Sequence, residues 1–380
     1  MKVVVLGAGL VGGPMAIDLA KTKNFEISIV DKNENALDRI HEKFFISKTV
    51  CDLSKAENVK NIVKDFDIVV NAVPGFMGFS TLKSIIESKK NVIDIAFFPE
   101  NLFELDDLAK QNNVIAISDI GVAPGMSNVL IGYVDNILDV TETAKIYVGG
   151  LPKIREWPYE YKAVFSPIDV IEEYTRPARY VENGVEIVRP ALSDPELLNF
   201  SGIGTLEAFN SDGLRSLAKT INAKNMIEKT LRYKGHIDKM AVLRETGFFN
   251  KEPIEINGTM ISPLEFTSKI LFPKWKLNEG EEDITVMKVI VQGIKNGQKL
   301  SYEYNLFDTY DKKTKTHSMA RTTGYTATTA VRMLAEGLYT RVGVSAPEFI
   351  GKNHKCVDFL LNGLKERGVI YKETIVRTPL

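Results

Sequence analysis

A glycine-rich turn near the start of the chain has the spacing of a dinucleotide-binding loop. Gly7, Gly9 and Gly12 form the pattern G-x-G-x-x-G, with Leu10 and Val11 before the last glycine. The turn lies between a short apolar run and a helical pattern. Glycines at this spacing permit a tight turn and a close approach of the backbone to a pyrophosphate, and the free N–H groups at the start of the helix bind its oxygens. We therefore assign these five residues to a cofactor site.

A carboxylate at the end of the second apolar run indicates which dinucleotide binds. Asp31 lies where an acidic group accepts hydrogen bonds from the adenosine ribose and repels a 2′-phosphate. Lys32 follows it and is compatible with that phosphate, so the pair favours NAD over NADP without excluding NADP. Other candidates for the cofactor site lie at expected strand ends: Asn71, Ala72, Val73 and Pro74, together with Asp52 and Asp94, which are equally suited to capping the next helix.

The elements that must position these residues alternate along the first 120 residues. Short, almost wholly apolar runs predict strands at 3–6, 27–30, 67–73, 91–95 and 114–117. Amphipathic segments between them predict helices at 15–22, 34–43, 55–64, 81–88 and 102–111. This alternation is typical of an α/β fold with a doubly wound parallel sheet, covered by helices on both faces, which is a Rossmann domain.

The pattern changes after residue 125. Asn183-Gly184 and Asn296-Gly297 each separate two strand-like runs, which predicts two β-hairpins with tight turns. Further strands are expected at 141–148 and 161–165, and helices at 211–220, 235–245, 325–336 and 353–367. We expect three parts: a Rossmann domain at 1–125, an inserted α+β domain with a mostly antiparallel sheet at 126–320, and a C-terminal helical segment at 321–380 that packs back on the Rossmann domain.

Composition narrows the class of protein. The 380 residues carry 48 Lys and Arg against 49 Asp and Glu, a balance that predicts neither nucleic-acid nor membrane binding. No apolar run has the length of a membrane span, and the chain begins directly with a strand pattern, so we expect a cytoplasmic protein. Two cysteines and four histidines without ligand spacing predict no metal site. No Ser/His/Asp arrangement suggests a hydrolase.

Three segments are similar to one known family. The segments at 119–128 (DIGVAPGMSN), 147–152 (YVGGLP) and 226–236 (MIEKTLRYKGH) resemble, in order and spacing, those of the saccharopine dehydrogenase family. The stretches 146–153, 169–178 and 207–217 look like its L-lysine 6-dehydrogenase branch. Members that form or cleave saccharopine typically carry an acidic residue before the Pro-Gly pair and a His three residues after it, whereas this chain has Ala123 and Asn128 there.

The resemblance implies an enzyme that oxidises an amine carbon with NAD. For L-lysine the ε-carbon gives up a hydride, and hydrolysis of the imine yields ammonia and 2-aminoadipate 6-semialdehyde. Two alternatives stay open: a saccharopine or carboxylated-polyamine dehydrogenase of the same family, and a non-catalytic protein that senses NAD. We also expect a homo-oligomer, in the simplest case a dimer, because the hairpins of the second domain offer sheet edges for association.

Oxidation of an amine needs a group near the amine and groups that hold the rest of an amino acid. The amine has to lose a proton, so an acidic side chain or a base is required, and Arg is the natural partner of the α-carboxylate. Asp119 is the first candidate for catalysis, although it also suits a turn or a helix cap. The remaining candidates are Tyr233 and His236 for catalysis, Arg176 and Arg232 for the carboxylate, and Glu207 for the α-ammonium.

Overall fold

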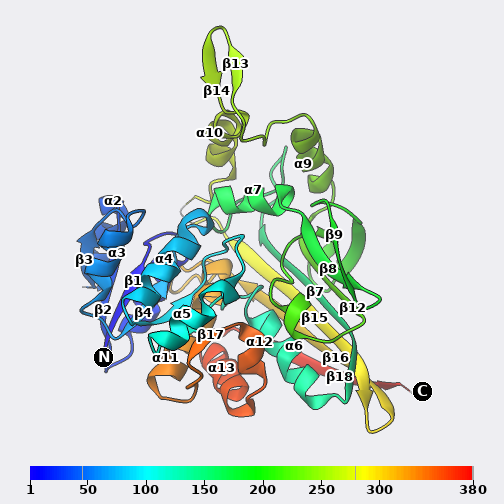
Figure 1. Cartoon of the computed structure of the whole chain (residues 1–380). Helices are drawn as coiled ribbons and strands as arrows, with labels where there is room; N and C mark the ends of the chain where they lie inside the picture. The colour runs from blue at the N-terminus through cyan, green and yellow to red at the C-terminus, as the bar shows by residue number, and fades with distance from the viewer. Residues whose placement is uncertain (45, 279, 379–380) are drawn as a thin grey trace.

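Two β-sheets organise the chain, and its C-terminal segment contributes a strand to each of them (Figure 1). The computed structural model describes residues 1–44, 46–278 and 280–378. The N-terminal sheet has seven parallel strands in the order β17-β6-β5-β4-β1-β2-β3. They are β1 Lys2–Leu6, β2 Glu26–Asp31, β3 Ser47–Val50, β4 Ile68–Asn71, β5 Asn91–Asp94, β6 Ile115–Ile117 and β17 Gly343–Ser345.

The order of these strands reverses between β1 and β4, as in a Rossmann domain, which confirms the predicted fold class. The strands of this sheet are apolar because helices cover both of its faces, and β4 is buried along its whole length. The helices are α1 Gly12–Ala20, α2 Glu34–Phe44, α3 Ala56–Val63, α4 Gly75–Glu87 and α5 Asp106–Gln111, the last preceded by the 3-10 turn η1 Leu102–Leu105. Helix α4 begins earlier than predicted, directly after Pro74.

The second sheet is mostly antiparallel, as expected. Its order is β10-β11-β12-β7-β15-β16-β18. Strand β8 pairs with β12 and β9 pairs with β8, and among the described strands of this sheet only β7 and β12 pair in parallel. The strands are β7 Val140–Pro152, β8 Ala178–Glu182, β9 Val185–Arg189, β10 Glu196–Phe200, β11 Gly204–Asn210, β12 Asn225–Tyr233, β15 Asp283–Lys295, β16 Gln298–Thr309 and β18 Tyr371–Thr378. A separate hairpin, β13 Ile254–Ile256 and β14 Thr259–Ile261, projects from the body (Figure 1).

Both predicted hairpins form, for the reason that the sequence suggested. The turn between β8 and β9 has φ of 52° at Asn183 and 79° at Gly184, and that between β15 and β16 has 49° at Asn296 and 72° at Gly297. Two consecutive residues with positive φ define the tight turn that matches the twist of the flanking strands.

Three expectations were wrong. Residues 161–165 form no strand, since only Ala163 makes an isolated bridge, to Lys276. Of the helix expected at 211–220 only α8 Leu217–Thr220 exists, because Ser211 and Gly213 bond to the Glu228 side chain and Arg215 has φ of 53°. The C-terminal tail is not only helical, because it also supplies β17 and β18.

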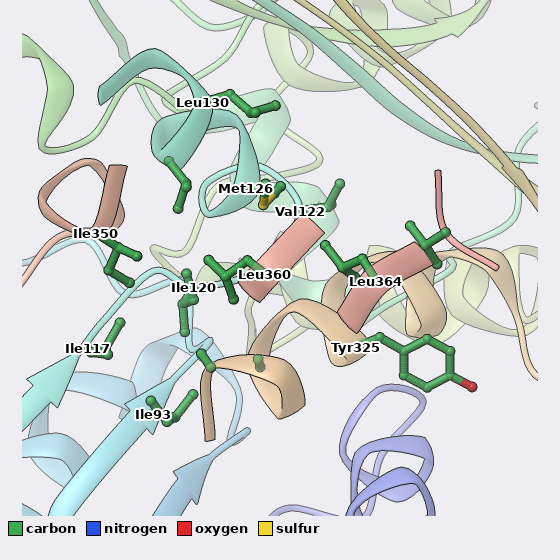
Figure 2. Packing of buried hydrophobic residues seen from close by; sticks show 14 of the residues in the cluster. Ile93, Ile117, Ile120, Val122, Met126, Leu130, Tyr325, Ile350, Leu360 and Leu364 are labelled. Carbon is green, nitrogen blue, oxygen red and sulfur yellow. The ribbon is translucent and has the colours of Figure 1, made fainter. Parts of the chain in front are cut away.

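The remaining helices either link the two sheets or lie between strands of the second domain. They are α6 Met126–Ile137, α7 Pro167–Thr175, α9 His236–Glu245, α10 Pro263–Trp275, α11 Ser318–Ala335, α12 Pro347–Gly351 and α13 His354–Glu366. Helices α6, α11 and α13 share one apolar core with the parallel sheet, as Leu130, Leu360 and Ile117 illustrate (Figure 2). None of the helices that the structure describes combines the length and apolarity needed to cross a bilayer.

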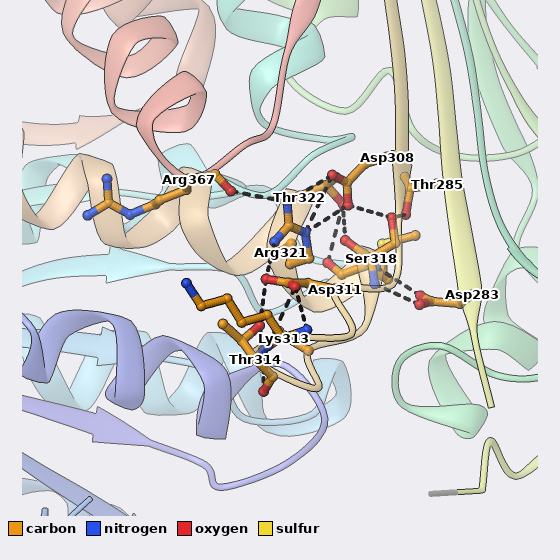
Figure 3. A network of polar contacts seen from close by, with 12 residues as sticks. Asp283, Thr285, Asp308, Asp311, Lys313, Thr314, Ser318, Arg321, Thr322 and Arg367 are labelled. Atoms are coloured by element: carbon orange, nitrogen blue, oxygen red, sulfur yellow. Dashed lines mark hydrogen bonds and ion pairs between the residues drawn. The ribbon is translucent and has the colours of Figure 1, made fainter. Parts of the chain in front are cut away.

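Buried charges fix α11 between the two sheets. Asp283 accepts hydrogen bonds from the first two N–H groups of the helix, those of Ser318 and Met319, at 2.7 and 3.0 Å (Figure 3). Asp308 on β16 pairs with Arg321 one turn later. On the Rossmann side, the Asp18 carboxylate of α1 bonds Arg332 of α11 and Arg367, which follows α13. The N-terminal and C-terminal parts of the chain are thus tied together around the cofactor turn.

Candidate active site

A cavity of about 430 Å³ lies where the Rossmann domain meets the second sheet. The turn between β1 and α1 forms one end of its lining, together with the residues that follow β4 and the loop 119–124. The other lining residues come from strands β7 and β12, helix α7 with the residues on either side of it, the segment after β5, the loop 211–213 and the start of α11. Segments far apart in the sequence therefore build one site, at the carboxyl edge of the parallel sheet, where this fold binds ligands.

The glycine turn has the shape that the sequence predicted. A Cβ on Gly7 would lie 2.5 Å from the Ala72 carbonyl oxygen, and a Cβ on Gly12 would lie 2.1 Å from that of Gly7, so neither position admits a side chain. A Cβ on Gly9, by contrast, would meet no protein atom within 4 Å. Helix α1 begins here without a side-chain cap. The Gly13 N–H donates to the Gly9 carbonyl at 3.1 Å and Pro14 has no N–H, so the Gly12 N–H is the donor of the first turn that is left for an anion. Leu10 and Val11 also line the cavity, so all five predicted residues of the turn are at the site.

Asp31 lines the same end of the cavity and is held rigidly. Its Oδ2 accepts a hydrogen bond from the Ala8 N–H at 2.7 Å, and its Oδ1 accepts one from the Asn33 N–H at 2.8 Å. Lys32 is exposed and Asp52 bonds Ser54, so neither contributes to the lining. Hydrogen bonds from Ser54 lower the pKa of Asp52, which acts as a turn cap.

The predicted residues at the end of β4 divide into a lining and a support. Ala72, Val73 and Pro74 line the cavity. Asn71 lies beneath them and donates to Asp94 Oδ1 at 3.0 Å. Asp94 also accepts hydrogen bonds from Ser118 and Ala96. Burial raises the pKa of Asp94 to about 7. Asn71 and Asp94 therefore tie the ends of β4, β5 and β6 together from below.

Asp119 lies in the cavity wall, paired with an arginine that sequence reasoning missed. Arg215 Nε lies 3.0 Å from Asp119 Oδ2, and its Nη2 lies 3.3 Å from Oδ1, with both side chains buried. Asp119 has φ of 58°, which is uncommon for a residue with a side chain. The pair joins the Rossmann domain to the second domain. Arg215 lies in the family-like stretch 207–217, which was the available signal, but no role was assigned to this residue from the sequence.

Arg176, predicted to bind a carboxylate, is the cavity's cation with free donors. Its Nε and Nη1 are buried and meet no hydrogen-bond partner among the residues that the structure describes. Its Nη2 lies 3.6 Å from Glu172, and its guanidinium lies 4.5 Å from the centre of the Phe97 ring. Burial, and next the nearby Arg215, lower the pKa of Arg176, yet a guanidinium remains protonated in proteins. This buried cation can therefore bind an anion.

Arg232, the second arginine predicted to bind a carboxylate, is paired with groups of the protein itself. Arg232 pairs with Glu173, donates to the Tyr174 hydroxyl at 3.2 Å and stacks on the Tyr161 ring. His236 bonds the same hydroxyl through Nε2, at 3.0 Å, and the Tyr159 carbonyl through Nδ1, at 2.9 Å. Since a carbonyl only accepts, Nδ1 carries the proton and Nε2 accepts from Tyr174. Burial and Arg232 lower the pKa of His236 to about 3, so the ring is neutral.

Two other predicted residues also lie outside the cavity lining. The Tyr233 hydroxyl donates to the Pro152 carbonyl at 2.9 Å, which ties β12 to the end of β7. Glu207 accepts a hydrogen bond from the Gly235 N–H at 3.0 Å and fixes the turn before α9. The family-like segment at 226–236 therefore contributes mainly a buried framework beside the cavity.

One residue of that segment does line the cavity, and sequence reasoning overlooked it. Glu228 on β12 is buried, and its Oε2 accepts hydrogen bonds from Ser211 Oγ at 2.7 Å and the Gly213 N–H at 3.0 Å. Burial raises the pKa of Glu228 to about 8, and the carboxylates of Glu173 and Asp212 act in the same direction. The alternation of β12 was the available signal, because it places Glu228 on the same face as Arg232.

A second buried acid lines the cavity near Arg176. Asp169 on α7 is hydrogen-bonded by Ser166 and by the Gly75 N–H, and burial raises its pKa. Glu172, one turn later on the same helix, also lines the cavity. Among the described residues, no group of three His, Cys, Asp or Glu side chains has the arrangement of a metal site.

Comparisons with known proteins agree with this architecture. A family model described as the saccharopine dehydrogenase NADP binding domain matches residues 3–117, and one described as the saccharopine dehydrogenase C-terminal domain matches residues 121–369. The mitochondrial alpha-aminoadipic semialdehyde synthase of Rattus norvegicus is 26% identical over 266 residues, covering 66% of this chain. The chain spans only part of that relative, since the match covers 29% of its length.

Two further proteins match along most of their length. The carboxyaminopropylagmatine dehydrogenase of Synechocystis sp. is 24% identical over 371 residues, covering 90% of this chain and 91% of the relative. The solved structure of apo saccharopine dehydrogenase (L-Glu forming) from Saccharomyces cerevisiae superposes with a TM-score of 0.80 at 17% identity, covering 99% of both chains. That structure shares the fold found here.

Proposed function

The chain belongs to the saccharopine dehydrogenase family, and from that premise we propose that it is an NAD-dependent L-lysine 6-dehydrogenase. The family makes it an oxidoreductase with a nicotinamide cofactor, which acts on the amine of an amino acid or polyamine. The proposed reaction converts L-lysine, NAD and water into 2-aminoadipate 6-semialdehyde, NADH, an ammonium ion and a proton. The observation that carries the choice of lysine is the balance of acidic and cationic side chains in the cavity lining.

The cofactor end of the cavity supports NAD. Gly7 and Gly12 leave no room for side chains, whereas the space beside Gly9 is open, as a bound pyrophosphate requires. The Asp31 carboxylate is fixed by two backbone N–H groups at the place where it would meet the ribose hydroxyls. It would repel a 2′-phosphate. When bound, the nicotinamide ring accepts the hydride from the substrate carbon.

The substrate end of the cavity contains more acids than cations that are free to act. Three carboxylates are neutralised by guanidinium groups: Asp119 by Arg215, Asp212 by Arg179 and Glu173 by Arg232. Without those pairs, the lining retains Arg176 as a cation and Asp169, Glu172 and Glu228 as acids. Glu172 is itself shared with Arg176 and with Lys251, at 3.6 and 3.2 Å.

This pattern complements lysine, which has one carboxylate and two ammonium groups. Arg176 Nε and Nη1 are free buried donors on different edges of the guanidinium, so each can give the carboxylate one hydrogen bond, or two together with Nη2, which lies 3.6 Å from Glu172. Asp169 and Glu172 lie on α7, which Arg176 directly follows, and would hold the neighbouring α-ammonium. Saccharopine has three carboxylates, which would leave two of them facing acids. The match supports a monocarboxylate with two amines.

A carboxylated polyamine is the second candidate, because the same cavity would accept it. Such a molecule combines one carboxylate with several cations, and a relative named for that class of substrate matches along 91% of its length. The difference from lysine is length. A substrate with a long cationic tail needs room beyond Glu228, and the cavity of about 430 Å³ also has to hold part of the dinucleotide. The volume therefore favours the shorter substrate.

The test is NADH formation by the purified protein with NAD and one amine at a time. We expect NADH with L-lysine, one ammonium ion for each NADH, and no NADH with saccharopine. NADH from saccharopine alone, with glutamate or 2-oxoglutarate as product, would refute the proposal and keep the family. NADH from a carboxylated polyamine alone would establish the second candidate. NAD binding without turnover of any amine would favour a non-catalytic sensor.

A further inference from the structure

We propose that Glu228 is the catalytic base, the group that takes the proton from the reacting ammonium of the substrate. This inference rests on the proposed function, since it supposes an amine substrate with its reacting nitrogen at β12. Hydride can leave a carbon only after the attached nitrogen has a free lone pair. A lysine ammonium has an ordinary pKa near 10.4, so at neutral pH only about one molecule in a thousand is uncharged. The protein must therefore supply an acceptor.

The position of Glu228 provides that acceptor with one oxygen held and one oxygen free. Oε2 is fixed by Ser211 Oγ and the Gly213 N–H, at 2.7 and 3.0 Å. Oε1 accepts no hydrogen bond from the part of the chain that the structure describes, and the residue lines the cavity. A Cβ on Gly213 would lie 2.5 Å from Oε2, so the loop 211–213 is shaped around this carboxyl group.

The other acids of the cavity are less suited to the same role. Asp119 and Asp212 each face a guanidinium with both oxygens, so neither keeps an oxygen free for a substrate ammonium. Glu173 is paired with Arg232. Asp169 lies on α7, which Arg176 directly follows, and suits the α-ammonium. Among the cavity's buried acids that the structure describes, Glu228 combines the lack of a cationic partner with an oxygen that accepts no hydrogen bond, and it lies on β12 rather than on α7 with Arg176's neighbours.

The substrate ammonium gives one proton to the Glu228 carboxylate. The N–H bond of the substrate ammonium breaks, its electron pair stays on nitrogen, and the proton forms an O–H bond at Glu228 Oε1. The nitrogen lone pair then assists loss of the hydride to the cofactor named above. The carboxyl group must be ionised before each cycle, so its proton leaves to solvent.

The surroundings of Glu228 set the pH at which this occurs. Two acids face it, Glu173 from α7 and Asp212 from the loop before α8, and each has its own arginine, Arg232 and Arg179. Burial is the largest cause of the pKa rise to about 8. In the free protein at pH 7, Glu228 is therefore protonated, and an ammonium ion placed beside Oε1 would expel that proton.

Calorimetry on the protein without cofactor tests this prediction independently of turnover. L-lysine is titrated at pH 7 in two buffers of different ionisation enthalpy, and the difference in heat gives the number of protons released. We expect about one proton for the wild type and none for Glu228→Gln. The matched control is Glu207→Gln, the same change on the neighbouring strand at a residue outside the cavity lining, which should release the same proton as the wild type.

The pH profile of kcat/KM gives the second readout. For the wild type we expect a rise with pH around 8. Glu228→Gln should lose roughly 10²- to 10⁴-fold in kcat at pH 8, the usual range for removal of a general base. Its activity should recover towards pH 10.4, where lysine arrives already neutral. A merely structural role would not produce recovery at high pH.

The outcomes separate this inference from the proposed function. If the wild type makes no NADH from lysine, the proposed function fails, and the experiment is repeated with the amine that is turned over. If the wild type oxidises lysine but Glu228→Gln keeps its rate, its pH profile and its proton release, Glu228 is not the base. A loss of activity in Glu228→Gln that persists at pH 10.4 would also overturn the inference.

Discussion

Replacing Glu228 by Gln should make the protein more stable at alkaline pH, although it removes a group proposed to be catalytic. Burial raises the pKa of Glu228 from its ordinary value of 4.5 to about 8. Between these two values, the unfolded chain releases a proton that the folded protein retains. Stability therefore falls as pH rises through this window, and the full cost is present above pH 8. Gln does not titrate and keeps an oxygen for the Gly213 N–H.

The size of the effect follows from the two pKa values. At 1.36 kcal/mol for each unit of pKa, a difference of about 3.5 corresponds to roughly 5 kcal/mol. The unfolding entropy of a 380-residue protein is about 0.8 kcal/mol/K, so the melting temperature should rise by about 6 °C at pH 8.5. This value is an upper bound, because Gln forms weaker hydrogen bonds with Ser211 and Gly213 than a carboxylate does.

Differential scanning fluorimetry at pH 4.5 and pH 8.5 measures this difference. The melting temperatures of wild type and Glu228→Gln should nearly coincide at the lower pH and separate at the higher one. Glu207→Gln should show no such separation, since its partner, the Gly235 N–H, lies outside the cavity. A variant that melts below the wild type at pH 8.5 would refute the reasoning, because it would show that the folded protein favours the ionised form of Glu228.

Three other residues give tests of the cofactor turn, the substrate anchor and the domain contact. Arg176→Gln should raise KM for L-lysine about 100-fold in the NADH assay, because it removes the partner of the substrate carboxylate. KM for cadaverine, which lacks the carboxylate, should be almost unchanged. Equal effects on both amines would contradict the assigned role. Gly9→Ala should have the melting temperature of the wild type, because no protein atom lies within 4 Å of the added Cβ. It should bind NAD at least 10-fold more weakly by calorimetry, because that Cβ enters the space proposed for the pyrophosphate. Unchanged binding would place the pyrophosphate elsewhere. Asp18→Ala should lower the free energy of unfolding, measured by urea denaturation, by roughly 3–5 kcal/mol, because it leaves Arg332 and Arg367 without their partner. A change below about 1 kcal/mol would show that these ion pairs do not hold the C-terminal segment on the Rossmann domain.

The fold was largely predictable because its signals are local. The glycine turn, the apolar strands and the two Asn-Gly turns each depend on a few neighbouring residues, and each occurs as expected. The errors arose where residues distant in the sequence determine the local structure. Strand β17 has three residues and joins the parallel sheet beside β6, and β18 joins the second sheet beside β16, so neither is visible without the tertiary structure.

The site was predictable at its cofactor end and much less at its substrate end. The turn at Gly7 and the carboxylate of Asp31 lie together because they follow adjacent parallel strands, a relation that the strand pattern reveals. The pairing of Asp119 with Arg215, by contrast, joins residues 96 positions apart. In the sequence, the motif at 226–236 favoured Arg232 over Arg176. The structure reverses that order, because the buried Glu173 carboxylate pairs with Arg232, whereas Arg176 keeps two donors without a partner among the described residues.

That difference suggests how the cavity obtains its specificity. An isolated buried charge is costly, so a protein keeps one only where a ligand supplies the missing partner or chemistry requires it. Most buried charges at this site are neutralised within the protein, as Asp119 is by Arg215 and Glu173 by Arg232. The incompletely paired Arg176 and the unpaired Glu228, which ionises when an ammonium binds beside it, then mark the two substrate groups that the cavity is proposed to hold, a carboxylate and an ammonium.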